Sequence, residues 1–162
     1  MKKIVFISII ITALFSIGGC VAKKELGKPQ AIMAEIGKPG TVVVTVWSYN
    51  KTPNIEDEVV FENAVKCLLF EGIEADESRR MKGRPALAPR AYEYNANYFD
   101  TFFSNKQYLP FCSMGMEGYV EQGNLIKTGN GYKIGKMVVV DYDQLRKKLV
   151  FDGIIRGLDS GF

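Results

Sequence analysis

The chain has 162 residues, with 21 lysines and arginines against 18 aspartates and glutamates, and its formal net charge is +3. This small excess gives no field that would attract nucleic acid, so we expect no nucleic-acid partner. The sequence contains no histidine, which excludes Ser-His-Asp triads, Cys-His dyads and zinc sites that depend on imidazole.

A short basic segment and an apolar run open the chain. Lys2 and Lys3 precede residues 4–17, of which only three are polar. The run is shorter than the roughly 20 apolar residues of a membrane-spanning helix, and it is typical of a signal peptide. It is followed by Gly18-Gly19-Cys20.

This ending resembles the lipobox of bacterial lipoproteins. The resemblance implies that residues 1–19 are a signal peptide, that the chain is cut before Cys20, and that this cysteine carries the lipid that binds the membrane. Val21 and Ala22 follow without an aspartate, which in lipoproteins favours the outer membrane, and we expect the side facing the periplasm. An ordinary secretory signal with an incidental cysteine is the alternative.

The remaining chain divides into a tether and one domain. Residues 20–40 carry the lipidated cysteine and two similar segments, ELGKP and EIGKP, whose glycines and prolines predict a flexible linker. Residues 41–162 are long enough for a single domain with a core of its own.

The pattern of the domain predicts an α+β fold. Residues 41–49 are rich in valine and aromatic residues and predict a strand with two apolar faces, hence a central one. A helix over 55–71 follows, capped by Asn54 and stopped by Gly72. We expect a second helix over 91–104 and a strand over 107–112.

The rest of the domain predicts a hairpin and a final helix. Residues 125–128 and 132–140 flank Asn130-Gly131, a strong turn signal, and Asp141 with Gln144 predicts a helix start. The order is β-α-α-β-β-β-α, a mostly antiparallel sheet of about four strands packed with two to three helices. The residues expected in the core include Phe61, Leu68, Phe99, Val138 and Leu145.

Several short segments of the domain resemble a group of uncharacterised lipoproteins of Gram-negative gut anaerobes. The resemblance covers about residues 41–162, and it implies the fold and an envelope location but no activity. The element order is also similar to that of the N-terminal domain of the flagellar-assembly T protein. The segments that carry the first resemblance include Val46-Trp47-Ser48-Tyr49, Phe70-Glu71-Gly72, Tyr98-Phe99-Asp100, Tyr132-Lys133-Ile134-Gly135 and the ending Gly153-Ile154-Ile155-Arg156-Gly157-Leu158-Asp159-Ser160-Gly161-Phe162.

Two cysteines remain in the domain once Cys20 is set aside. In an oxidising compartment Cys67 and Cys112 could form a disulfide. The alternative is that both are buried core thiols, since Cys67 lies among apolar helix residues.

A basic segment between residues 79 and 90 is the surface candidate for a partner, either an acidic envelope protein or an anionic glycan. A solvated loop balanced by Glu74, Asp76 and Glu77 is the alternative. The basic residues are Arg79, Arg80, Lys82, Arg84 and Arg90.

No motif selects a catalytic chemistry, a metal or a cofactor, and we expect none of the three. The sequence has no phosphate-binding glycine loop and no dinucleotide fingerprint. Our hypothesis is therefore a non-catalytic binding or structural module of the cell envelope. The alternative is a hydrolase of an envelope polymer that uses carboxylates, for which Asp100, Glu117, Glu121 and Asp141 are candidates.

Overall fold

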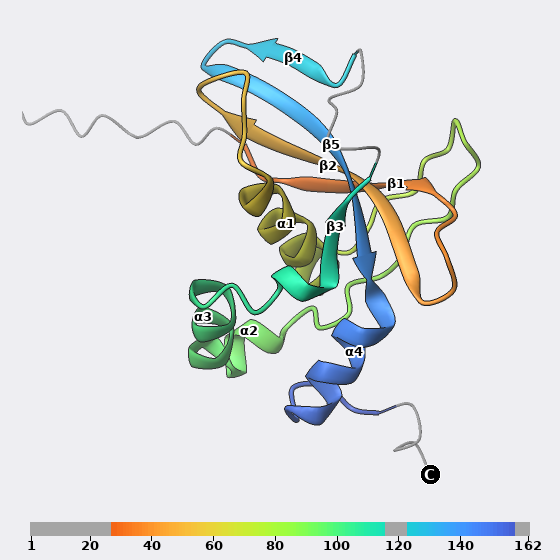
Figure 1. The fold of residues 1–162 in the computed structure, drawn as a ribbon, viewed down its shortest axis with the longest axis vertical. Coiled ribbons are helices and arrows are strands. Elements are labelled where there is room, and N and C mark those ends of the chain that lie inside the picture. The colour runs from red at the N-terminus through yellow and green to blue at the C-terminus, as the bar shows by residue number, and fades with distance from the viewer. Residues whose placement is uncertain (1–26, 116–122, 158–162) are drawn as a thin grey trace, which may run out of the picture.

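The computed structural model describes residues 27–115 and 123–157. Its centre is a pair of long antiparallel strands, β2 (Thr41–Asn50) and β5 (Gly131–Asp141), which pair from Thr41↔Asp141 to Asn50↔Tyr132. The other edge of β2 pairs with β1 (Gln30–Glu35). The other edge of β5 pairs with β4 (Leu125–Thr128) near its start and β3 (Cys112–Met114) near its end. The curled antiparallel sheet with its helices confirms the α+β fold (Figure 1).

Strand β1 corrects the expected domain boundary, because residues 30–35 were assigned to the tether. Ala31 and Met33 are buried and lie opposite Val46 and Val44 of β2, and this burial stabilises the strand. Of the glycines and prolines that suggested a linker, Gly27 and Pro29 precede β1, whereas Gly37 and Pro39 lie in the β1–β2 loop. In that loop Thr41 N donates to Lys38 O at 2.9 Å. The ordered domain therefore begins ahead of residue 41.

The helices follow the expected order with changed ends. Helix α1 (Asp57–Lys66) continues into a π turn, Cys67–Glu71, and ends at Gly72, whose φ is 96°. Its N-cap is Glu56, not Asn54, and this residue makes no side-chain cap.

The expected helix over 91–104 is interrupted at Asn95, which separates α2 (Ala91–Tyr94) from α3 (Ala96–Ser104). Asn95 leaves the helical region of backbone angles, and its Nδ2 donates to Ala91 O at 3.0 Å. The expected strand over 107–112 is instead a 3₁₀ turn, Leu109–Phe111, ahead of the short β3. Pro110, at the start of that turn, has no N–H for a ladder.

Helix α4 (Tyr142–Phe151) begins as predicted, since Gln144 N donates to Asp141 Oδ1 at 3.1 Å. The predicted core is confirmed for Leu68, Phe99, Val138 and Leu145, which are buried, whereas Phe61 is half-buried.

The hairpin forms between the predicted strands, but its turn lies one residue earlier than the expected Asn130-Gly131. Thr128 pairs with Gly131, so Gly129 and Asn130 form the loop and Gly131 opens β5. Asn130 does not have a positive φ. The pairing of Leu125 with Ile134 sets this register.

Candidate functional site

One face of the sheet carries no helix among the described residues. Along β2, Val42, Val44 and Val46 join the main core, to which the buried side chains of α1, α3 and α4 also belong. The residues between them point the other way, where Val43, Ala34 and Met137 form a small separate cluster with Val139. The outer face of the sheet is thus apolar near the start of β2 and the end of β5.

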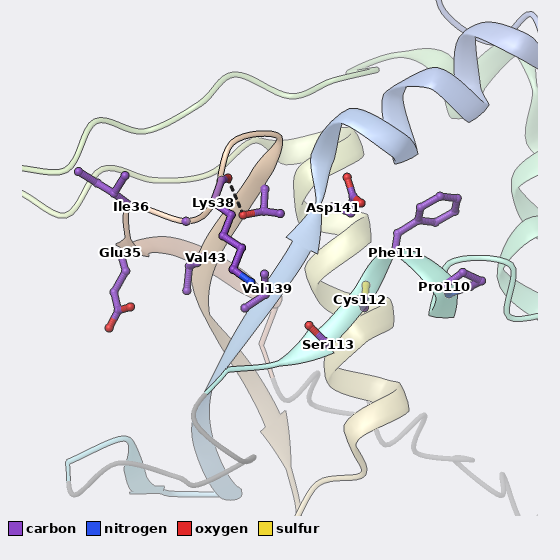
Figure 2. A pocket seen from close by; sticks show the side chains of 12 residues that line it. Glu35, Ile36, Lys38, Val43, Pro110, Phe111, Cys112, Ser113, Val139 and Asp141 are labelled. Atoms are coloured by element: carbon purple, nitrogen blue, oxygen red, sulfur yellow. Dashed lines mark hydrogen bonds between the residues drawn. The ribbon is translucent and has the colours of Figure 1, made fainter.

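A pocket of about 590 Å³ lies at one end of this outer face. The β1–β2 loop forms one wall, the turn before β3 forms the other, and the floor is the start of β2 and the end of β5 (Figure 2). Val43, Val139 and Phe111 give the pocket an apolar surface, and its charged groups come from Glu35, Lys38 and Asp141.

Local structure fixes the charged residues around the pocket. The Lys38 carbonyl accepts the Thr41 N–H at 2.9 Å and the Thr41 hydroxyl at 2.8 Å, which holds the loop in place. Figure 2 shows the Lys38 side chain running across the pocket toward Val139. Asp141 is held by its cap on α4. The arrangement offers one ammonium and two carboxylates around an apolar floor, a combination suited to a polar chain with an apolar side group.

The edge strand β3 adds a backbone feature to the pocket. Ser113 is exposed and lies opposite Val139, and within the described ranges β3 pairs with β5 alone. An edge strand beside a pocket can accept an extended polypeptide through main-chain hydrogen bonds. Sequence reasoning missed this site because its residues come from four separate segments and match no motif.

The two cysteines of the domain are free thiols, so the disulfide considered from the sequence is not formed. Burial raises the pKa of Cys112, which lines the pocket, to about 12. Burial, with the nearby carboxylates of Glu71 and Glu74, raises the pKa of Cys67 to about 11. Both thiols are therefore protonated near neutral pH, where only the thiolate is an effective nucleophile.

The basic segment forms a ribbon on the edge of β1 instead of an open loop. Ile73 bridges to Arg84, and Asp76 bridges to Met81. Glu74 N donates to Ala31 O at 2.9 Å, and Met33 N donates to Glu74 O at 3.0 Å. The ribbon thus covers part of the exposed edge of the sheet.

The candidate binding residues of this segment are all exposed, but most of them contact groups of the domain itself. Arg79 Nη1 donates to Ala34 O at 3.1 Å, the Arg84 guanidinium lies 5.1 Å from the Tyr142 ring centroid, and Arg90 Nε lies 3.6 Å from Glu93 Oε2. Arg80 and Lys82 are exposed. Three of the five cations are therefore engaged within the domain.

The carboxylates proposed for a hydrolase are only partly within the described residues. Asp100 accepts the Tyr92 hydroxyl at 2.7 Å, away from the pocket, whereas Asp141 lines it. Glu117, Glu121 and the lipid-attachment candidate Cys20 lie outside the described residues. Across residues 27–115 and 123–157, no three histidine, cysteine or acidic side chains gather as a metal site would require.

Comparison with known proteins finds no family model, no curated protein and no solved structure that matches the chain. None of the helices in the described ranges combines the length and the apolar character that crossing a membrane requires.

Proposed function

We propose that this protein is a lipid-anchored, non-catalytic module of the bacterial envelope, held in the outer membrane on its periplasmic side, that binds a polypeptide segment of another envelope component. The lipobox-like Cys20 and the apolar run ahead of it support the anchor. The observation that carries the binding function is the pocket beside β3, an edge strand that pairs only with β5 among the described residues, on a sheet face to which no described helix contributes.

The geometry favours binding over chemistry. The Cys112 thiol is protonated near neutral pH and is therefore a poor nucleophile. The pocket is also bounded by the edge strand β3, which offers main-chain hydrogen bonds to a bound polypeptide. An extended segment could pair with β3 and place an apolar side chain against Val43 and Val139, while its charges meet Lys38 or the two carboxylates.

A photo-crosslinking residue placed at Ser113 in cells tests this proposal, with the same residue at the exposed Ser104 of α3 as the matched control. We expect a discrete crosslinked protein from position 113 that is absent from position 104. The product should weaken when Lys38→Glu reverses the charge at the pocket. Crosslinks of equal pattern at both positions would contradict the proposal.

A carboxylate hydrolase is the second candidate, because Glu35 and Asp141 line the same pocket. Glu35→Gln and Asp141→Asn remove the charge and keep the shape of each side chain. If the protein is a hydrolase, both changes should abolish the release of soluble fragments from isolated envelopes. If it is a binding module, the wild-type protein should release none.

A further inference from the structure

The end of the sheet opposite the pocket is rich in lysines. The start of β1, the end of β2, β4 and the start of β5 meet there, since Gln30 pairs with Trp47, Lys133 with Tyr49, and Ile126 with Lys133. Figure 1 shows the β4–β5 turn and the loop that follows β2 at this end, with α4 at the opposite end.

The described residues at this end include five lysines, and carboxylates lie only at its margins: Glu71 and Glu74 line a pocket with Lys28, and Glu56 lines another with Tyr49. The described stretches 27–34, 47–55 and 123–140 hold no aspartate or glutamate. Acidic side chains begin at the first turn of α1, where Asp57 pairs with Lys136 at 2.7 Å. Glu56 is exposed in the same turn. The cations of the three stretches are Lys28, Lys51, Lys127, Lys133 and Lys136.

Exposed aliphatic and half-buried aromatic side chains lie among these lysines. Leu125 and Ile126 of β4 are 46% and 47% exposed. Lys133 Nζ lies 4.9 Å from the centroid of the Trp47 ring and 5.9 Å from that of Tyr49. Lysines interleaved with aliphatic and aromatic residues are typical of surfaces that lie in the headgroup region of a bilayer.

The path of the chain brings this end close to the proposed anchor. Gly27 lies against Tyr49, since a Cβ on it would meet the Tyr49 ring at 2.8 Å. Seven peptide steps join Cys20 to Gly27, and a fully extended chain of that length spans at most about 25 Å. The distance along β2 from Tyr49 to the pocket residues Val43 and Thr41 is roughly 20–26 Å, at about 3.3 Å per residue.

We propose that this end of the sheet, defined by Lys28, Lys51, Leu125, Ile126 and Lys127, docks on anionic phospholipid headgroups and points the pocket away from the membrane. The inference rests on the proposed lipid anchor at Cys20. Lipid attachment supplies the membrane affinity, and the lysines and β4 side chains fix the orientation by electrostatic attraction and shallow burial.

Labelling of the acylated full-length mature protein in vesicles tests the orientation. Ile126→Cys reports on the docking end. Its control is Gln144→Cys, which lies on the exposed first turn of α4. The unsubstituted protein gives the background labelling of Cys67 and Cys112. With a water-soluble maleimide, we expect position 126 to react at least about fivefold more slowly on vesicles containing phosphatidylglycerol than in detergent. Position 144 should react equally in both.

Charge reversal separates the contribution of the lysines from that of the anchor. Lys51→Glu with Lys127→Glu should restore rapid labelling at position 126, whereas Lys82→Glu with Lys147→Glu should not. Equal labelling of position 126 on vesicles and in detergent would overturn the orientation. Protection that persists in detergent would assign this end to a protein contact and would also overturn it.

Flotation of the same samples distinguishes the two proposals. The charge-reversed protein should still float with the vesicles, because its lipid is intact, and the Cys20→Ser protein should not. A wild-type protein that fails to float would refute the anchor and the orientation together. A wild-type protein that floats without protection at position 126 would refute the orientation alone.

Discussion

The Tyr98 hydroxyl donates to Asp152 Oδ2 at 2.6 Å and so joins α3 to the end of α4. Lys148 Nζ lies 2.8 Å from the same oxygen. Burial raises the pKa of Asp152, but the hydrogen bonds from Lys148 and Tyr98 outweigh it, and the net pKa lies below its usual value. The partly buried Asp152 carboxylate therefore stabilises the contact between α3 and α4, whose buried side chains also meet in the core.

Tyr98→Phe should lower the free energy of unfolding by about 1–2 kcal/mol at pH 7, since it removes a hydrogen bond to a charged acceptor. The pKa of Asp152 is lowered on folding, so its contribution is complete above its unfolded pKa of about 3.9 and is lost as the pH falls through the folded value. The difference between wild type and variant should therefore shrink below about pH 4. Urea unfolding at pH 7 and pH 3 measures it, with the exposed Tyr94→Phe as control.

Leu68→Ala should destabilise the domain by about 2–5 kcal/mol, because it leaves a cavity in the core beneath the sheet. Leu68 is 1% exposed. The same truncation at the half-exposed Leu125 should cost much less. Thermal unfolding of both variants checks the comparison, and similar losses would mean that the π turn does not face the core.

Gly72→Ala should destabilise the domain by roughly 1–3 kcal/mol, because a side chain at positive φ is strained. Its Cβ would also lie 2.8 Å from the Arg84 carbonyl oxygen. Gly129→Ala in the β4–β5 turn is the matched control, since a Cβ there meets nothing within 4 Å. Equal effects in urea unfolding would contradict the placement of the two glycines.

Cys67 and Cys112 should react very slowly with iodoacetamide at pH 8 in the folded protein. With pKa values of about 11 and 12, roughly one thiol in a thousand or fewer is ionised at that pH. Both should be alkylated in urea without prior reduction, which mass spectrometry can count. Alkylation that requires a reductant would show that the two residues form a disulfide.

Those helices and strands whose pattern lies within one continuous segment could be predicted from the sequence. The apolar faces of β2, the position of Gly72 and the Asp141–Gln144 cap were all predicted from local patterns and are confirmed. Strand β1 could not be predicted, because its buried side chains are the small Ala31 and Ala34 and the single Met33 beside a glycine-rich loop. The edge that β2 offers on one side and the backbone of Glu74 on the other make that segment a strand.

The candidate site was beyond prediction for a different reason. Lys38 was assigned to the tether and Ser113 lay just beyond an expected strand, so no pattern joined them. The basic segment was predicted to be a surface feature. In the structure Arg79 donates a hydrogen bond to Ala34 O, and the Arg84 guanidinium lies over the Tyr142 ring. Which charges remain available to a partner depends on tertiary neighbours that a single sequence does not reveal.

The pairing of β2 with β5 would have a consequence for export, if the chain is secreted as we propose. Residues 41–50 pair on one edge with residues 132–141, and contacts between such distant segments form slowly. In a chain that crosses a membrane with its N-terminus first, the central ladder cannot close until most of the domain has emerged. The topology itself would then keep the polypeptide in the unfolded state that a narrow secretion channel demands.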